Sequence, residues 1–366
     1  MKILHINSYY SSSPFYKHLF DYQIKKNLDI DVYVPVSNKF EDTNREYGEY
    51  TKLIKNHRSI DRYFFHIKHG KILRDVKNQY SVDSYNVIHA HSLFSNGFIA
   101  YKLFKEYGVP YIVAVRDTDL NIFFGKMIHL RSLGIRIMHN AKKIIFLSSN
   151  YRNKTIKKYV PIDLQKEMIK KSLVIPKGID PFWLNNKIKG KKKLNENTIN
   201  ILYAGRISKR KNIYTTVKAC QILQSRGYKV KFTIVGKIED QKEFDKINGY
   251  EFINYSNMQS KESLINFYRA NDIFVMPSIT ETFGLVYAEA MSQGLPVIYT
   301  KGQGFDGQFD EGVVGYHVNC FDASNIADKV LEIIDNYETI SQNCKDLVDK
   351  FNWEDISNLY IKIYQE

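Results

Sequence analysis

The chain has 366 residues, of which 44% are hydrophobic and 25% are charged; these values are ordinary for a soluble globular protein and exclude collagen, coiled coil and extensive disorder. This length fits two domains better than one. It contains no run of about 18 apolar residues, and MKILHINSYY at the N-terminus lacks the long apolar core of a signal peptide, so we expect neither a spanning helix nor a secretion signal.

The formal net charge is +14, and its distribution along the chain is uneven. Residues 1–180 contain 30 Lys+Arg and 16 Asp+Glu, which accounts for the whole excess. A one-sided basic surface attracts phospholipid headgroups, nucleic acid or a charged substrate. The alternative is a lysine-rich compositional bias, but such a bias should affect both halves. The three cysteines show no CxxC or metal-ligand spacing, which suits buried thiols in a reducing compartment.

In the first half, short apolar runs alternate with longer amphipathic segments. Runs that are apolar throughout, such as YIVAV, suit a sheet that is buried on both faces. The alternation therefore predicts a parallel α/β sheet. The predicted strands are Ile3–Ile6, Val32–Val34, Val87–Ala90, Tyr111–Val115, Ile144–Leu147 and Leu173–Ile175.

After an aperiodic join at Pro176–Thr198, the same alternation restarts, so two similar α/β domains are expected. The last segment, FNWEDISNLYIKIYQE, carries an apolar stripe at helical spacing that must pack on something. The stripe comprises Trp353, Ile356, Leu359, Tyr360 and Ile363. The predicted strands of the second series are Asn200–Tyr203, Lys231–Val235, Phe252–Ile253, Ile273–Met276 and Val297–Tyr299, and the predicted helices are Lys209–Ser225, Ser260–Arg269, Leu285–Ser292 and Ala323–Asn336.

Two glutamates, Glu281 and Glu289, stand in the otherwise apolar stretch PSITETFGLVYAEAMSQGLPVIYT. Glu281 follows a predicted strand, where ligands of open α/β sheets bind, and a helix is expected to begin near Gly284. The unpaired N–H groups at a helix start favour phosphate, and glycine lets a ligand approach the backbone. Carboxylates accept from hydroxyls, so a nucleotide sugar fits. Alternatively, Glu281 only complements the helix dipole and Glu289 is solvated.

The stretch ILYAGRISKRKN supports the phosphate interpretation. A predicted strand ends at Ala204-Gly205 and is followed by Arg206, whose planar fork suits phosphate, and by Lys211, which offers a point charge. The alternative is a basic turn that caps a helix.

Together these segments resemble the family-4 retaining glycosyltransferases of the GT-B fold, also called glycosyl transferases group 1. The shared marks are a Gly-Arg…Lys-Asn turn and a Pro-Ser…Glu-x-Phe-Gly…Glu-Ala motif, in order and at suitable spacing. VIPKGID, Gly315-Tyr316 before Phe321-Asp322, and FNWEDI are further similarities. The resemblance implies two Rossmann-like domains with parallel sheets facing a central cleft: residues 1–178 for the acceptor, joined by the final helix 352–366, and residues 179–351 for the nucleotide sugar.

The resemblance also implies roles for individual residues. Arg206 and Lys211 would hold the diphosphate and its developing charge, and Glu281 would contact the donor sugar. The remaining donor contacts would be Gly205, the Phe283, Gly284 and Leu285 backbone, Glu289 at the ribose, and Tyr255, Ser256, Asn257 and Met258 at the base.

The first domain departs from the family pattern at two places. Many relatives carry glycine in the first loop, where this chain has Ser11, Ser12 and Ser13; these face a phosphate or acceptor, or form an ordinary turn. Relatives often place a histidine after the strand written here YIVAV, where this chain has Arg116 and Asp119. Asp119 would orient an acceptor hydroxyl and Arg116 would stabilise charge, or the two form a structural pair.

His89 and His91, in VIHAHS, are expected to point to opposite sides of a strand end. His91 is the better candidate for a catalytic role, and His89 is interpreted as a core histidine. No third ligand is expected nearby, and the family chemistry is usually metal-free, so we expect no metal and no cofactor.

The implied function is retaining transfer of a hexosyl group from a UDP- or GDP-sugar to a hydroxyl of a glycan or lipid-linked acceptor, in synthesis of a bacterial surface polysaccharide such as capsule. We expect a cytoplasmic protein that is peripheral on the inner membrane face, with Gly125–Lys143 as a basic amphipathic candidate for that surface or simply a surface helix. Nucleic acid is not an expected partner. The rival functions are an epimerase or hydrolase of the same fold, a nucleic-acid binder, and a non-catalytic sugar-nucleotide sensor.

Overall fold

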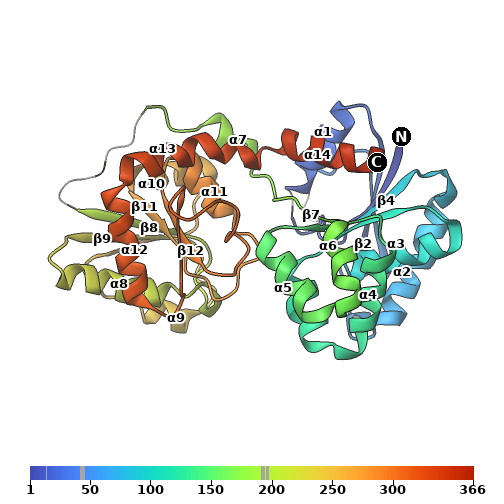
Figure 1. Ribbon diagram of the computed structural model, residues 1–366, viewed down its shortest axis with the longest axis horizontal. Helices are drawn as coiled ribbons and strands as arrows, with labels where there is room; N and C mark the ends of the chain where they lie inside the picture. The colour runs from blue at the N-terminus through green and yellow to red at the C-terminus, as the bar shows by residue number, and fades with distance from the viewer. Residues whose placement is uncertain (14, 42–45, 191–193, 195–197) are drawn as a thin grey trace. The chain divides into compact units, whose positions relative to one another are not determined.

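The computed structural model describes residues 1–366 apart from positions 14, 42–45, 191–193 and 195–197 (Figure 1). The chain forms two compact units. The N-terminal domain comprises Met1–Pro176 and Trp353–Glu366, and the C-terminal domain comprises Lys177–Asn352. The predicted boundaries, after residue 178 and before residue 352, lie within two residues of this division. No helix of the described residues is long and apolar enough to cross a membrane.

The N-terminal domain is built on a seven-stranded parallel sheet of order β3-β2-β1-β4-β5-β6-β7. Its strands are β1 (Lys2–Ile6), β2 (Asp29–Ser37), β3 (Thr51–His57), β4 (Val87–Ala90), β5 (Tyr111–Ala114), β6 (Lys143–Phe146) and β7 (Ser172–Val174). Its helices are α1 (Tyr16–Lys25), α2 (Phe65–Gln79), α3 (Ser95–Tyr107), α4 (Arg131–Asn140), α5 (Ser149–Tyr159), α6 (Ile162–Lys170) and α14 (Trp353–Gln365), with short helical turns η1 (Ser59–Tyr63), η2 (Val82–Ser84), η3 (Asp119–Phe124) and η4 (Ile128–Leu130).

Both faces of this sheet are covered, because successive strand residues point to opposite sides and both sets are apolar. Ile3 belongs to a core formed with α1 and α14, whereas Leu4 belongs to a core formed with α2 to α6. In Figure 1, α14, the last helix of the chain, lies beside α1, close to the N-terminus.

Helix α14 is therefore part of the N-terminal domain core. Trp353, Ile356, Tyr360 and Ile363 are buried, as the apolar stripe predicted. Leu359 is an exception: it is exposed, and Tyr364 takes a buried place instead.

The C-terminal domain has a six-stranded parallel sheet of order β10-β9-β8-β11-β12-β13. Consecutive strands run outward from β8 in one direction and from β11 in the other, so the carboxyl ends of β8 and β11 define the switch point at which such sheets bind ligands. The strands are β8 (Ile199–Ala204), β9 (Val230–Val235), β10 (Ile253–Ser256), β11 (Ile273–Val275), β12 (Val297–Thr300) and β13 (Gly315–Val318). The helices are α7 (Pro181–Asn185), α8 (Ile213–Ser225), α9 (Gln241–Asp245), α10 (Lys261–Ala270), α11 (Leu285–Ser292), α12 (Ala323–Asp335) and α13 (Tyr337–Leu347), with helical turns η5 (Lys209–Lys211) and η6 (Val348–Phe351).

Candidate active site

The switch point of the C-terminal domain holds a buried ion pair. The Lys211 amine, at the end of η5 after β8, lies 2.5 Å from a Glu281 carboxylate oxygen, in the loop after β11. Only 11% and 12% of the two side chains are exposed. Burial lowers the pKa of Lys211, and the adjacent Glu281 acts in the opposite direction. The topology thus brings together two residues that lie 70 positions apart and that the sequence assigned to one site.

Further groups hold Glu281 in place. Its backbone N–H donates to the Gln303 side-chain oxygen at 2.9 Å, and its second carboxylate oxygen accepts from the Thr282 N–H at 3.1 Å. The Arg210 guanidinium lies 3.6 Å from the carboxylate and donates to the Thr280 carbonyl at 2.7 Å. Arg210 and Gln303 were not predicted. Arg210 adjoins Lys211 in the basic turn, which is a usable signal, whereas nothing in the sequence marks Gln303.

Helix α11 begins beside this pair, at the predicted position. Its N-cap is Gly284, with a φ of 79° and no side-chain cap. A Cβ there would come within 2.5 Å of the Tyr287 ring and 3.2 Å of the Glu281 Cγ, so no other residue fits without strain. An α-helix leaves its first N–H groups without intrahelical partners, and the N-cap Gly284 has no side chain that could bond to them. The helix start thus remains available to an anion.

A pocket of about 520 Å³ adjoins the same helix start and lies beyond the carboxyl ends of β8 and β9. The Arg206 guanidinium at its wall lies 3.3 Å from a Glu239 oxygen, and 72% of the Arg206 side chain is exposed, so this cation is held loosely. The pocket is lined by Ala204, Gly205, Arg206, Val235, Gly236, Lys237, Glu239, Met258, Gln259, Leu264 and Val286. Gly205, Arg206 and Met258 were predicted site residues.

Close backbone approach shapes the wall of this pocket. A Cβ on Gly236, whose φ is 155°, would lie 1.8 Å from the Gly205 carbonyl oxygen, so the loops after β8 and β9 touch only because position 236 is glycine. The N–H of Gly236 also donates to the Ser256 carbonyl at 3.0 Å.

The predicted base loop, Tyr255–Met258, is partly turned to the pocket. Met258 lines it and is exposed. Tyr255 instead donates from its hydroxyl to the Gly236 carbonyl at 3.0 Å, and its ring packs on Phe244. The Asn257 side chain accepts from the Met258 N–H. These contacts position the loop; only Met258 of the four lines the pocket.

Glu289 lies further along α11, and its carboxylate accepts from the Tyr268 hydroxyl at 3.3 Å. Burial raises the pKa of Glu289 to about 7, with the Tyr268 bond acting against the shift. The alternative in which Glu289 is simply solvated does not describe this geometry.

The raised pKa of Glu289 leads to a pH-dependence prediction. The resemblance implies that Glu289 accepts from the ribose hydroxyls of a nucleotide sugar; in that role, affinity for the nucleotide sugar should fall as pH is lowered through about 7, because an ionised carboxylate accepts such bonds best. The raised pKa also affects stability, because the folded protein holds the carboxyl proton of Glu289 more tightly than the unfolded chain does. Glu289 therefore adds to the free energy of unfolding at low pH, and this contribution is lost as pH rises from the ordinary glutamate pKa toward 7. Isothermal titration of the donor against pH measures the first effect. Glu289→Gln should flatten the profile, and Glu338→Gln, on α13, is the control; an unchanged profile in Glu289→Gln would contradict the assignment.

In the N-terminal domain, the predicted acceptor residues are mostly engaged with the protein itself. The Ser11 and Ser12 hydroxyls donate to the Ser8 and Tyr9 carbonyls, at 3.0 and 3.1 Å. This geometry is that of the ordinary serine-rich turn; Ser13, which is partly buried, lies in the same segment. The predicted acceptor role of the three serines remains a prediction.

Asp119 and Arg116 are both buried, but they do not form a simple ion pair. The Asp119 carboxylate accepts from the backbone N–H groups of Arg116, Leu93 and Phe94, at 2.8, 3.0 and 3.0 Å. Burial raises the pKa of Asp119 to about 6, against these bonds. The Arg116 guanidinium donates to the His91 carbonyl at 3.1 Å, and its Nη1 has no hydrogen-bond partner among the described residues. Asp119 thus anchors the loop, and Arg116 retains an unused donor.

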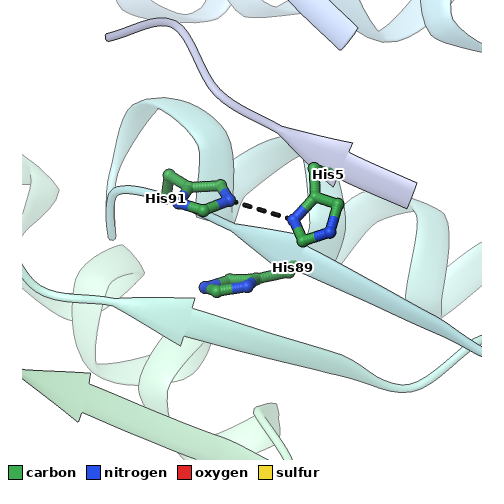
Figure 2. Close-up of side chains that lie close together, drawn as sticks. All are labelled: His5, His89 and His91. Carbon is green, nitrogen blue, oxygen red and sulfur yellow. Dashed lines mark hydrogen bonds between the residues drawn. The ribbon is translucent and has the colours of Figure 1, made fainter. Parts of the chain in front are cut away.

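The expectation that His89 and His91 point to opposite sides was wrong. Residues two positions apart share a face of a strand, and both rings lie buried on the α1–α14 side, stacked with centroids 4.0 Å apart. The expectation that no third candidate ligand lies nearby was also wrong: Figure 2 shows His5, from β1, bonded to His91 through ring nitrogens 3.1 Å apart. Burial lowers the pKa of His5 to about 3 and those of His89 and His91 well below the ordinary value.

Three neutral imidazoles suit a metal ion by chemistry but not by arrangement. Each ring nitrogen directs its lone pair within the plane of its ring, and the planes of His89 and His91 are stacked at 19° to one another. Two stacked planes 4.0 Å apart do not converge on one ion at a bonding distance of about 2 Å. His89 is also occupied by the Tyr364 hydroxyl at 2.7 Å. The trio therefore packs α14 against the sheet in this arrangement, and the absence of a metal stays a prediction.

Comparison with known proteins identifies the family. Residues 185–348 match the family model described as glycosyl transferases group 1. An uncharacterized 41.2 kDa protein from the cps region of Klebsiella pneumoniae is 30% identical over 306 residues, or 77% of this chain and 79% of that protein. The capsular polysaccharide biosynthesis glycosyltransferase CapM of Staphylococcus aureus is 33% identical over 196 residues, so the match spans only about half of each protein (50% of this chain and 51% of CapM). The chain belongs to the glycosyl transferases group 1 family.

Solved structures confirm the predicted GT-B fold. Sucrose-phosphate synthase from Thermosynechococcus elongatus superposes with a TM-score of 0.75 at 18% identity, over 100% of this chain and 98% of that one. The lipopolysaccharide outer core galactosyltransferase WaaB gives 0.74 at 13% identity, over 99% of both chains. Anabaena Alr3699/HepE, solved in complex with UDP and glucose, gives 0.69 at 16% identity, over 100% of both chains.

Proposed function

We propose that this glycosyltransferase moves a hexosyl group from a UDP- or GDP-sugar to a hydroxyl of a glycan or lipid-linked acceptor, with retention of the anomeric configuration. The observation that carries the proposal is the buried Lys211–Glu281 pair beside the uncapped start of α11. HepE, a structural neighbour, binds UDP and UDP-glucose, and CapM takes part in capsular polysaccharide biosynthesis. These relatives support a UDP-sugar donor and a surface polysaccharide product.

The pyrophosphate would lie at the start of α11, with Lys211 on one side and Arg206 on the other. The base would enter the pocket between Gly205, Gly236 and Met258. Glu281, oriented by Lys211, would accept from hydroxyls of the donor sugar, and Glu289 from the ribose. A loosely held Arg206 suits this role, because its guanidinium can leave Glu239 for the diphosphate.

In the reaction, the bond between the anomeric carbon and the diphosphate oxygen breaks, and the acceptor oxygen bonds to the same face of the carbon. The acceptor proton passes to the departing diphosphate. Lys211, Arg206 and the helix N–H groups are arranged before the reaction for the charge that develops there, usually the largest catalytic contribution. Neither glutamate acts as a nucleophile. In the N-terminal domain, Arg116 would stabilise charge through its unpartnered Nη1 donor, and His91 and Asp119 would act through the loop that they hold.

The donor is tested by thermal unfolding of the full chain with UDP, GDP, ADP and their glucose conjugates. A donor at a hundredfold its dissociation constant should add about 2.7 kcal/mol to the free energy of unfolding. We expect the UDP compounds to protect, with or without a chelator of divalent ions. Protection by no nucleotide would overturn the proposal.

An epimerase or hydrolase of the same fold is the alternative function. Such an enzyme would consume the donor without any acceptor, whereas a transferase should release UDP only when an acceptor hydroxyl is supplied. The same assay tests the possibility of a non-catalytic sugar-nucleotide sensor, because a sensor would form no glycosylated product and release no UDP.

We place the enzyme in the cytoplasm, on the inner face of the membrane. In that location it would have access both to a nucleotide-sugar donor and to a lipid-linked acceptor. The segment Gly125–Lys143 is a weak anchor for that surface, because α4 turns Leu133, Ile137 and Met138 into the domain core. The outward face of that helix is left with polar groups such as Arg136.

A further inference from the structure

Four large apolar side chains of the N-terminal domain stand out from its surface close together in the chain. Ile60, Tyr63, Phe64 and Ile67 are 61%, 66%, 55% and 54% exposed. We call these four residues the aromatic patch. Outside residues 60–67, no eight-residue stretch of the described chain exposes more than two large apolar side chains. Exposed apolar groups that cluster in this way mark a surface with a partner.

The domain core does not need these side chains. Helix α2 buries Phe65, His69, Ile72 and Val76 along one face, at helical spacing. Phe64, the N-cap of α2, and Ile67 lie outside that buried stripe, and Ile60 and Tyr63 belong to the preceding turn η1. The patch is therefore apolar surface in excess of what packing requires.

The solvent-exposed charges around the aromatic patch are mainly positive. Residues 52–77 contain eight Lys+Arg and two Asp+Glu. Of the two carboxylates, Asp61 is buried, bonded to the Arg58 N–H at 2.7 Å and the Lys71 amine at 2.6 Å. Asp75 accepts from the Tyr33 hydroxyl at 2.5 Å and is partly buried. Arg58 and Arg62 are exposed beside the patch, and Arg62 lies over the Tyr63 ring, 4.7 Å from its centroid.

The patch also lies at a particular edge of the sheet. Turn η1 follows the carboxyl end of β3, and η3 follows the carboxyl end of β5, so in a parallel sheet both lie at the edge that carries the predicted acceptor loops. Phe65, beside the patch, packs on Phe123 of η3 with centroids 5.8 Å apart. Two further exposed residues, Ile122 and Ile128, belong to η3 and η4.

We propose that the aromatic patch inserts into the interface of an anionic lipid bilayer, with Arg58 and Arg62 against the headgroups. Aromatic rings flanked by cations are the side chains that settle at the boundary between headgroups and acyl chains. The positive surroundings favour anionic lipid and oppose a second copy of this chain, which would bring the same charge. The proposal rests on the proposed function in one respect: a lipid-linked acceptor would then be presented at the edge of the sheet that receives it.

The test is flotation of the full chain with vesicles of phosphatidylcholine, with and without phosphatidylglycerol. We expect binding that requires phosphatidylglycerol. Tyr63→Ser/Phe64→Ser should lower the partition coefficient roughly tenfold or more, because two apolar rings leave the interface. Arg58→Gln/Arg62→Gln should also lower it roughly tenfold or more, because two cations that attract anionic lipid are lost. The matched controls are Ile162→Ser, in the same domain and 87% exposed, and Phe321→Ser, in the other domain and 70% exposed; both should bind as the unmodified chain does.

Binding that is unaffected by the Tyr63/Phe64 variant, or equally reduced by the controls, would overturn the proposal. So would patch-dependent self-association in sedimentation velocity without vesicle binding, which would identify a second copy as the occupant. The four side chains are exposed, so their substitution should leave the unfolding curve unchanged. Flotation uses neither donor nor acceptor, so absence of vesicle binding would contradict only the membrane proposal and not the proposed transfer reaction. Conversely, absence of transferase activity would not change the vesicle result.

Discussion

Replacing Lys211 by methionine should lower kcat by about 10²–10³, the effect typical of losing one preorganised group that stabilises transition-state charge. Methionine is one atom shorter and keeps an apolar stem, but it lacks the amine that faces Glu281 at 2.5 Å. A radioactive or coupled assay of UDP release, at saturating donor and acceptor, measures the change.

The same substitution leaves Glu281 without its nearest cation, so stability must be separated from catalysis. Breaking a buried pair typically costs about 3–5 kcal/mol, and here Arg210 at 3.6 Å should reduce that cost. Lys211→Met/Glu281→Gln removes both charges and should recover much of the stability without recovering activity. Arg226→Gln, which breaks the more exposed pair with Asp328 on α12, is the control and should change neither. Full activity in the double variant would contradict the role of the pair.

Replacing Ile356 by alanine should destabilise the N-terminal domain by about 2–5 kcal/mol, although the residue lies ten positions from the end of the chain. The side chain is buried between α14 and the sheet. Deleting three methylene-sized groups there removes apolar burial and leaves a cavity that close-packed neighbours fill only in part.

The two tryptophans allow this effect to be assigned to one domain. Trp183 lies in the C-terminal domain and Trp353 in the N-terminal domain, so Trp183→Phe leaves one fluorescent reporter next to the site of change. Urea unfolding in that background should show a lower midpoint for Ile356→Ala and an unchanged midpoint for Leu359→Ala, whose side chain is 45% exposed. Equal midpoints in both variants would show that α14 does not stabilise the sheet.

The sequence was most informative where local pattern and tertiary structure agree. The buried strands of both sheets are apolar runs, and α11 begins at Leu285 as predicted because Gly284 allows its entry. The edge strand β3, TKLIKNH, was not predicted, because it is mostly polar and half exposed and has no clear period. Strand β13 and helix α13 were also not predicted: Gly315-Tyr316 was interpreted only as part of a motif.

Side-chain partners were harder to predict than positions. Lys211 and Glu281 were both expected in the site, but their direct pairing depends on β8 and β11 being neighbours, which no local pattern reveals. Asp119 was interpreted through its neighbour Arg116, whereas its carboxylate is bonded to three backbone N–H groups, two of them from Leu93 and Phe94, about 25 residues earlier. His5 was overlooked because it lies on β1, which pairs with β4 across more than 80 positions of sequence.

The position of α14 has a consequence for biosynthesis. During translation the N-terminal domain of a protein usually folds first, while the rest is still being made. In this chain the sheet of Met1–Pro176 is completed by a helix that leaves the ribosome only after the entire C-terminal domain. Until that helix emerges, the apolar surface that Trp353 and Tyr364 will cover stays open to chaperones. Nascent chains stalled before residue 353 should therefore be digested by protease in their first half and protected in their second.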